Sequence, residues 1–152
     1  MHYACDIFRL KPEIKTSCLL LVLEDYVIFA QPDPRLLIIG SLERKVAEEV
    51  SSSRSLVEKI MSDRPDTDGP SFASLLGACK VQGLPMIVTC IPVSEVREAE
   101  ASNWLRNGYL KITSLGAEMI SLSSTKSNVL AMLPMLRQAL GDRLTDKVKG
   151  KR

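Results

Sequence analysis

The thiol of Cys90 is the side chain in this sequence whose type and position best suit covalent chemistry. It lies near the end of the apolar run Pro85–Ile91, just before Pro92 and Ser94. Ser94 is a good N-cap for a following helix, and a thiol that faces a helix N-terminus has a lowered pKa and is a better nucleophile. Free cysteine is also often buried as a small hydrophobe, so a core position is the alternative.

A second candidate site is the polar loop 123–127, which precedes the last predicted helix. Its hydroxyl groups, one ammonium group and the free N–H groups of a helix start can bind an anion. The candidate anion-binding or ligand-binding residues are Ser94, Ser124, Thr125 and Lys126. The loop lacks the glycines of a phosphate-binding P-loop, so an ordinary capped loop is the alternative.

Several classes of enzyme are excluded by the residues that the sequence lacks. His2 is its single histidine, so no Ser-His-Asp triad and no histidine-rich metal site can form within the fold. A Cys-His pair with Cys90 requires the N-terminus to dock beside it. The cysteines, which are Cys5, Cys18, Cys79 and Cys90, show no zinc-type spacing. We expect no metal and no cofactor, and the sequence leaves open whether the protein is an enzyme.

The composition predicts one soluble globular domain. The chain has 152 residues, of which 45% are hydrophobic, and its 20 basic and 18 acidic residues leave a net charge of +2. So balanced a charge argues against nucleic-acid binding. The apolar runs are shorter than the roughly 20 residues of a membrane helix, so we expect no membrane association.

We expect a cytoplasmic protein with reduced thiols, because a chain of this length needs no disulfides. Residues Met1–Asp6 show no apolar stretch typical of a signal peptide. Residues 1–144 are predicted to form a single α/β domain, and residues 145–152 a flexible basic tail.

The first part of the chain is predicted to be rich in strands. The apolar runs Cys18–Leu23 and Tyr26–Ala30 flank Glu24-Asp25, which indicates either a hairpin or one long bent strand. Arg35–Gly40 is predicted to be another strand. Two helices are predicted next, over residues 42–50 and 55–61.

Helices and strands are predicted to alternate in the rest of the chain. The expected helices cover residues 71–82, 94–106 and 128–144, and the expected strands cover 85–91, 109–113 and 117–122. The first of these strands is apolar throughout, which is typical of a strand buried on both faces. Such alternation predicts a three-layer α/β sandwich with a mainly parallel, possibly mixed sheet of four to six strands, flavodoxin-like or Rossmann-like.

In such a sheet, ligands bind at the carboxyl ends of the strands. Three loops would therefore border a ligand site: Gly40-Ser41, Cys90–Ser94 and Ser123–Ser127.

The stretch 70–122 resembles the DsrE-type sulfur-relay proteins. The matching residues are Pro70-Ser71, Leu75, Gly83, Met86-Ile87-Val88, Cys90, Ser94, Leu105, Gly108 and Leu115-Gly116. The resemblance implies a flavodoxin-like fold, homo-oligomers or hetero-oligomers, and a cysteine at position 90 that carries a persulfide. Gly83 and Cys90 are one residue further apart than in that family, and the N-terminal third lacks the family's opening strand, glycine loop and helix.

Two functions follow from these observations. The first is a non-catalytic α/β module that binds a protein partner or a further copy of itself, with Trp104 buried in the core or in an interface. The alternative is a thiol-based sulfur carrier or transferase that uses Cys90. A small-molecule ligand is left unspecified.

Overall fold

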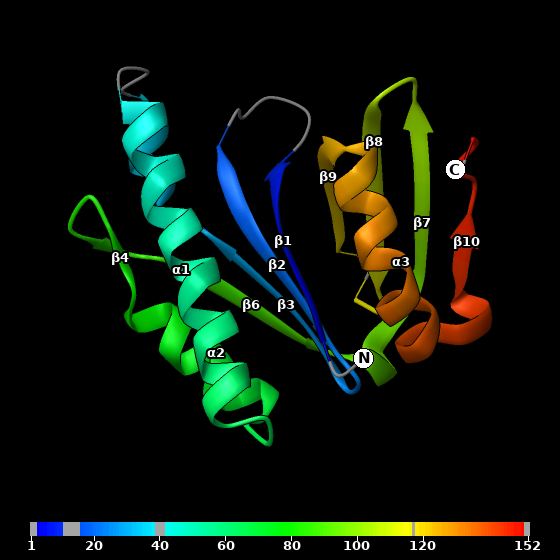
Figure 1. Cartoon of the computed structure of the whole chain (residues 1–152), viewed down its shortest axis with the longest axis horizontal. Helices are drawn as coiled ribbons and strands as arrows, with labels where there is room; N and C mark the ends of the chain where they lie inside the picture. The colour runs from blue at the N-terminus through cyan, green and yellow to red at the C-terminus, as the bar shows by residue number, and fades with distance from the viewer. Residues whose placement is uncertain (1–2, 11–15, 39–41, 117, 151–152) are drawn as a thin grey trace.

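The computed structural model of the chain describes residues 3–10, 16–38, 42–116 and 118–150. Its main sheet has eight strands in the order β10-β7-β8-β9-β1-β2-β3-β6 (Figure 1). These strands are β1 Tyr3–Leu10, β2 Ser17–Leu23, β3 Tyr26–Gln31, β6 Ile87–Pro92, β7 Val96–Trp104, β8 Asn107–Ser114, β9 Met119–Thr125 and β10 Leu144–Asp146. The short strands β4 Lys80–Val81 and β5 Leu84–Pro85 form a separate ribbon.

The prediction of a mainly parallel, flavodoxin-like sheet of four to six strands is wrong. Within the described residues, only β10 and β7 pair in parallel, and every other pair in the main sheet is antiparallel. The error comes from the segment predicted to be the helix 94–106, which forms β7. Without that crossover helix, the strands on either side of it have no reason to run parallel.

In the described part of the chain, three α-helices cover the sheet: α1 Glu43–Asp63, α2 Gly69–Ala78 and α3 Lys126–Leu140. Helices α1 and α2 lie to one side of β1, β2 and β3, and α3 lies to the other side (Figure 1). Alternate residues of β2 therefore point into different cores. Leu19 and Leu21 pack with α1 and α2, whereas Leu20 and Val22 pack with α3.

The sheet curls around α3. Strands β6 and β7 stand far apart in the strand order, yet only the 3₁₀ turn Val93–Glu95 separates them in the sequence. The end of β6 therefore meets the start of β7. The Arg143 guanidinium fixes this junction, because it donates hydrogen bonds of 2.7 Å to the carbonyl oxygens of Val93 and Val96.

The early part of the chain follows the sequence predictions in part. Residues 17–31 form the β2–β3 hairpin, which is one of the two alternatives that the sequence left open. The predicted strand Arg35–Gly40 is instead a 3₁₀ turn, Pro34–Ile38, and Gly40-Ser41 lie outside the described residues. Helix α1 is continuous through the serine cluster at 51–53, which was predicted to divide it.

The predicted helix 71–82 is α2, which begins two residues earlier and ends at Ala78. Its N-cap is Asp68, whose carboxylate accepts a hydrogen bond of 2.7 Å from the Ser71 amide.

The C-terminal segment lies along β7. Leu144–Asp146 forms β10, the Lys147 amide donates to the Ala101 carbonyl at 2.7 Å, and Val148 is buried. The predicted flexible tail 145–152 begins within this strand. Among the described residues, no helix is long and apolar enough to cross a membrane.

Candidate functional site

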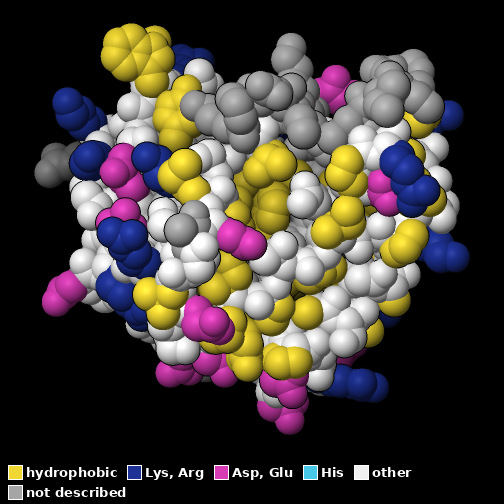
Figure 2. Space-filling model, turned by 180° about the vertical axis from the view of Figure 1, so that it is seen from behind, with side chains coloured by type: hydrophobic (Ala, Val, Ile, Leu, Met, Phe, Trp, Pro, Cys, Tyr) yellow, Lys and Arg dark blue, Asp and Glu magenta, His cyan; other side chains and the backbone are white. Residues whose placement is uncertain are grey.

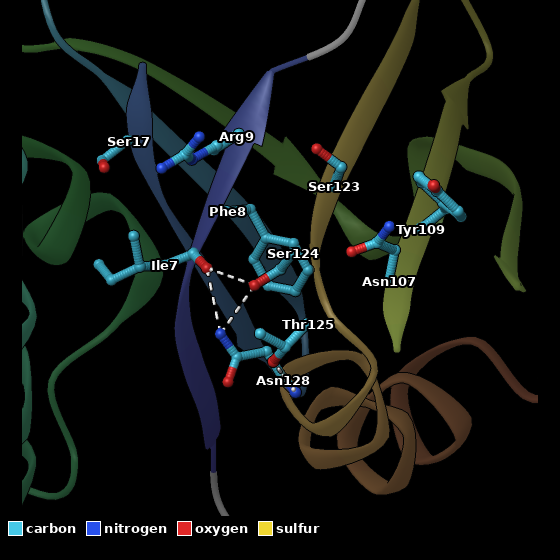
Figure 3. A pocket seen from close by; sticks show the side chains of 10 residues that line it. All are labelled: Ile7, Phe8, Arg9, Ser17, Asn107, Tyr109, Ser123, Ser124, Thr125 and Asn128. Carbon is cyan, nitrogen blue, oxygen red and sulfur yellow. Dashed lines mark hydrogen bonds between the residues drawn. The ribbon is translucent and has the colours of Figure 1, made fainter. Parts of the chain in front are cut away.

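A polar pocket opens where β1 and β9 separate. Among the described residues, these two strands pair over Arg9–Ser123 and Leu10–Leu122, and beyond Ser123 the chain soon turns into α3. The resulting hollow measures about 560 Å³ and is called here the β1–β9 pocket. Its lining residues are Ile7, Phe8, Arg9, Ser17, Asn107, Tyr109, Ser123, Ser124, Thr125 and Asn128 (Figure 3).

Side chains replace the missing backbone pairing at the inner end of this pocket. The Ile7 carbonyl accepts hydrogen bonds from the Ser124 hydroxyl at 3.1 Å and from the side-chain amide of Asn128 at 3.4 Å. The side-chain amide of Asn128 also donates to the Ser124 hydroxyl at 2.7 Å. These bonds hold the start of α3 against β1 (Figure 3).

The charge on the lining of the β1–β9 pocket favours an anion. Arg9 is the one charged residue of the ten that line it, and no carboxylate is among those ten, although the Glu43 carboxylate outside the lining lies 4.0 Å from the Arg9 guanidinium group. Arg9 and Ser17 lie on one side of the pocket, and Asn107 and Tyr109 lie on the other (Figure 3). Thr125 caps α3, so the N-terminal end of that helix dipole lies at the pocket as well.

The structure brings together two of the four residues predicted to bind an anion. Ser124 and Thr125 line the β1–β9 pocket, whereas Ser94 and Lys126 do not. Ser94 is exposed in the turn between β6 and β7, and no helix follows it. The Lys126 ammonium group instead donates to the Gly150 carbonyl.

The sequence reading missed Arg9, Ser17, Asn107, Tyr109 and Asn128. These residues come from distant segments, and they meet only because β9 lies between β1 and β8. The one local signal was the position of Asn128, the first residue of the predicted helix 128–144, directly after the polar loop 123–127.

Cys90 lies inside β6, and its environment disfavours the thiolate. Burial raises the pKa of the Cys90 thiol, and the nearby negative charge of Asp25 raises it further. The helix that was expected to follow and lower this pKa is the turn Val93–Glu95 and then β7. Burial also raises the pKa values of Cys5 and Cys18 to about 12 each.

Strand β6 forms one edge of the main sheet, and its hydrogen-bonding groups alternate in direction. The Val93 amide donates to the Asp25 carbonyl at 2.8 Å, and these two residues stand opposite each other in the β3–β6 register. In an antiparallel pair, hydrogen-bonded and non-hydrogen-bonded residue pairs alternate. Ile87, Thr89 and Ile91 therefore bond to β3, whereas the backbone groups of Val88 and Cys90 point away from the sheet.

The outer edge of β6 has no partner within the described part of the chain. The Met86 amide donates to the Cys79 carbonyl at 3.1 Å, which places the end of α2 beside the start of β6. Beyond Met86, no described residue bonds to the outward groups of Val88 or Cys90. The segment 85–91 was predicted to be a strand buried on both faces. That prediction is wrong, since Ile87 is 42% exposed.

Hydrophobic side chains are also exposed away from β6. Trp104 and Leu105, at the tip of the β7–β8 hairpin, are 70% and 76% exposed, so Trp104 is not in the core. In the view from behind, the middle of the face carries mainly hydrophobic and uncharged side chains, and Lys and Arg side chains lie towards its two sides (Figure 2).

Within the described ranges, no group of three or more His, Cys, Asp or Glu side chains could hold a metal ion. No protein-family model and no curated protein matches the chain.

Proposed function

We propose that this protein is a non-catalytic assembly module that binds another protein chain through the open edge of β6. The observation that carries the proposal is the pair of outward-facing N–H groups at Val88 and Cys90, on a strand without a charged residue. An extended segment of another chain can add to such an edge and satisfy these groups, which is the binding mode called β-augmentation.

The two edges of the main sheet differ in a way that supports this function. Proteins protect exposed edge strands with charged residues, or by keeping the strand short, because an open edge pairs with other chains. Strand β10 has only three residues and contains Asp146, with Lys147 directly after it. Strand β6 has six residues, Ile87–Pro92, none of them charged. Only its last residue, Pro92, lacks an N–H group.

The alternative function, a sulfur carrier that uses Cys90, has less support. Such a carrier needs an accessible thiolate as its nucleophile. Burial and the Asp25 carboxylate both raise the pKa of the Cys90 thiol, which keeps it protonated at neutral pH. We therefore assign Cys90 a role in the binding edge that depends on its backbone N–H and C=O groups and not on its thiol.

Photo-cross-linking from position 89 tests the assembly function. Thr89 lies at the middle of β6, and its side chain is on the same face as that of Ile91, which packs in the core around α3. With a benzophenone amino acid in place of Thr89, we expect a discrete adduct with another protein chain in living cells. The matched control carries the same amino acid in place of Thr145, an exposed residue of β10. Immunoblotting and mass spectrometry identify the adducts.

A second candidate function is the binding of a small phosphate-bearing or carboxylate-bearing ligand in the β1–β9 pocket. The specific observation is its lining: one guanidinium group, several hydroxyl and amide groups, a helix N-terminus and no carboxylate. A guanidinium group binds such anions through paired hydrogen bonds.

Inorganic phosphate titrated into the protein tests this second function. We expect saturable chemical-shift changes at Ser124 and Thr125, and a loss of affinity of about tenfold in Arg9→Gln, because a charge-assisted hydrogen bond is removed. Arg44→Gln is the control, since Arg44 lies on α1 outside the pocket and its side chain is 92% exposed. Equal affinities for the two variants, or no saturable response in the wild-type protein, would exclude the pocket as an anion site.

A further inference from the structure

The composition of β6 does not match its position in the sheet. An exposed edge strand is usually short or carries charged residues, because a long apolar edge pairs readily with another strand. β6 is an uncharged run, Ile87–Pro92, yet within the described residues it pairs with β3 alone. A further strand beside β6 would give it the surroundings that its composition suits.

The residues of β6 are nearly symmetric about Thr89. Ile87 and Ile91 flank this centre at a distance of two residues, and Val88 and Cys90 flank it at one residue. A strand with this symmetry presents the same chemistry when it is read in either direction. We propose that β6 pairs antiparallel with β6 of a second copy of this chain, about a two-fold axis at Thr89. The inference rests on the proposed function and names its partner.

The hydrogen bonds favour this register. With the axis at Thr89, Val88 of each copy stands opposite Cys90 of the other copy, and both residues point their N–H and C=O groups outward. Four hydrogen bonds form, and they use each N–H and C=O group of these residues. A shift of one residue would place outward-facing groups opposite groups that already bond to β3.

The neighbouring two-fold registers are less favourable. With the axis at Val88, Cys90 of the second copy would lie beside Met86, where the Cys79 carbonyl already accepts the amide hydrogen. With the axis at Cys90, the Val88 carbonyl would face Pro92 of the second copy, which has no N–H group to donate. With the axis at Thr89, the two features coincide in one terminal pair, because Pro92 of the second copy stands opposite Met86, and the four bonds between Val88 and Cys90 are kept. The second strand then leaves the edge after Ile91, before it reaches Cys79.

The side chains on the α3-facing side of β6 fit the same arrangement. Ile87 and Thr89 share this side with the buried Ile91, but α3 does not extend over them: Ile87 is 42% exposed. Pairing about Thr89 places Ile87 against Ile91 of the second copy and sets the two Thr89 side chains against each other. Such β-branched and Thr–Thr cross-strand pairs are favourable, and no like charges meet.

A cysteine introduced at position 89 tests this register. The two Thr89 residues would form a non-hydrogen-bonded pair with Cα atoms about 4.5 Å apart, which a disulfide can span. We expect Thr89→Cys to form a covalent dimer on mild oxidation, and mass spectrometry should place the disulfide between the two introduced thiols. The wild-type protein should form no Cys90–Cys90 bond, because each Cys90 faces Val88. Thr145→Cys, on the opposite edge strand, is the matched control and should stay monomeric in denaturing gels.

Sedimentation equilibrium gives a second readout that needs no cross-link. We expect a wild-type dimer whose dissociation constant rises about tenfold or more in Thr89→Lys, because two ammonium groups would meet at the axis. Thr145→Lys adds the same charge to β10 and should leave the dimer unchanged. The proposal is overturned by a monomeric wild-type protein, by a dimer that Thr89→Lys leaves intact, or by a disulfide in another register.

These outcomes separate the homotypic pairing from the proposed function. If the protein sediments as a monomer while the photo-cross-linker at position 89 captures a different protein, the edge binds a partner and the second-copy inference fails. If neither experiment gives an adduct at position 89, both fail.

Discussion

Replacing Gly108 with alanine is expected to destabilise the protein by roughly 3 kcal/mol, at the upper end of the cost of overpacking a core. A Cβ atom at this buried position would lie 2.4 Å from Cγ2 of Val129 and 2.7 Å from the Thr125 carbonyl oxygen. Because one of these atoms belongs to the backbone, the clash is relieved only if the start of α3 moves away from β8. Urea denaturation followed by circular dichroism measures the effect.

The matched control for Gly108→Ala is Gly77→Ala. At position 77, within α2, a Cβ atom would make an ordinary contact with Cγ2 of Val88 at 3.9 Å. Alanine is the better helix former, so we expect this variant to be more stable than the wild-type protein by roughly 0.5–1 kcal/mol. If both substitutions change the free energy of unfolding in the same direction, α3 does not pack on β8 as closely as described.

A second large effect is expected from alkaline pH. Burial raises the pKa values of the Cys5 and Cys18 thiols to about 12, whereas an unfolded cysteine ionises near pH 9. Between these values the unfolded chain releases protons that the folded protein retains, so stability falls as the pH rises above about 9. The expected loss is roughly 1 kcal/mol per pH unit for each thiol.

The double variant Cys5→Ala, Cys18→Ala isolates this contribution. Its free energy of unfolding, measured by urea denaturation at pH 8, 9 and 10, should decline less steeply than that of the wild-type protein, even though its absolute stability is lower. Parallel curves for the two proteins would show that these thiols ionise as readily in the folded state as in the unfolded state.

Local patterns in the sequence predict several elements of this fold. The apolar run at 18–23 and its neighbour at 26–30 form strands, and the stripe of Val46 and Val50 forms the buried side of α1. The two strands are continuous apolar runs whose side chains are buried on both faces of the sheet, and the α1 stripe has the spacing of a helix with one buried side.

The segment 96–104 shows why the topology was not predictable from the sequence. Its alanine, glutamate and arginine residues favour a helix, yet Ala99 and Ala101 alternate with exposed or half-exposed residues in β7. Pairing with β8 and β10 overrides the intrinsic preference of these residues. The mistaken helix implied a crossover connection, and the parallel sheet followed from it.

The candidate sites depend on this topology. Ser124 and Thr125 were predicted because a polar loop before a helix is a local signal, but Arg9 joins them only through the contact of β1 with β9. The apolar pattern that identified β6 as a strand says nothing about whether both of its neighbours belong to the same chain. Its position at the edge became visible only in the folded structure.

Photo-cross-linking from position 89 in living cells is the most direct test of the claim that the β6 edge binds a protein chain. The account predicts a discrete adduct from position 89 and none from position 145 on β10, which is the shorter and more highly charged edge. Loss of the adduct when the protein labelled at position 89 also carries Cys90→Pro would tie it to the outward N–H group of that residue. Equal labelling from positions 89 and 145, or no adduct from position 89, would contradict the account.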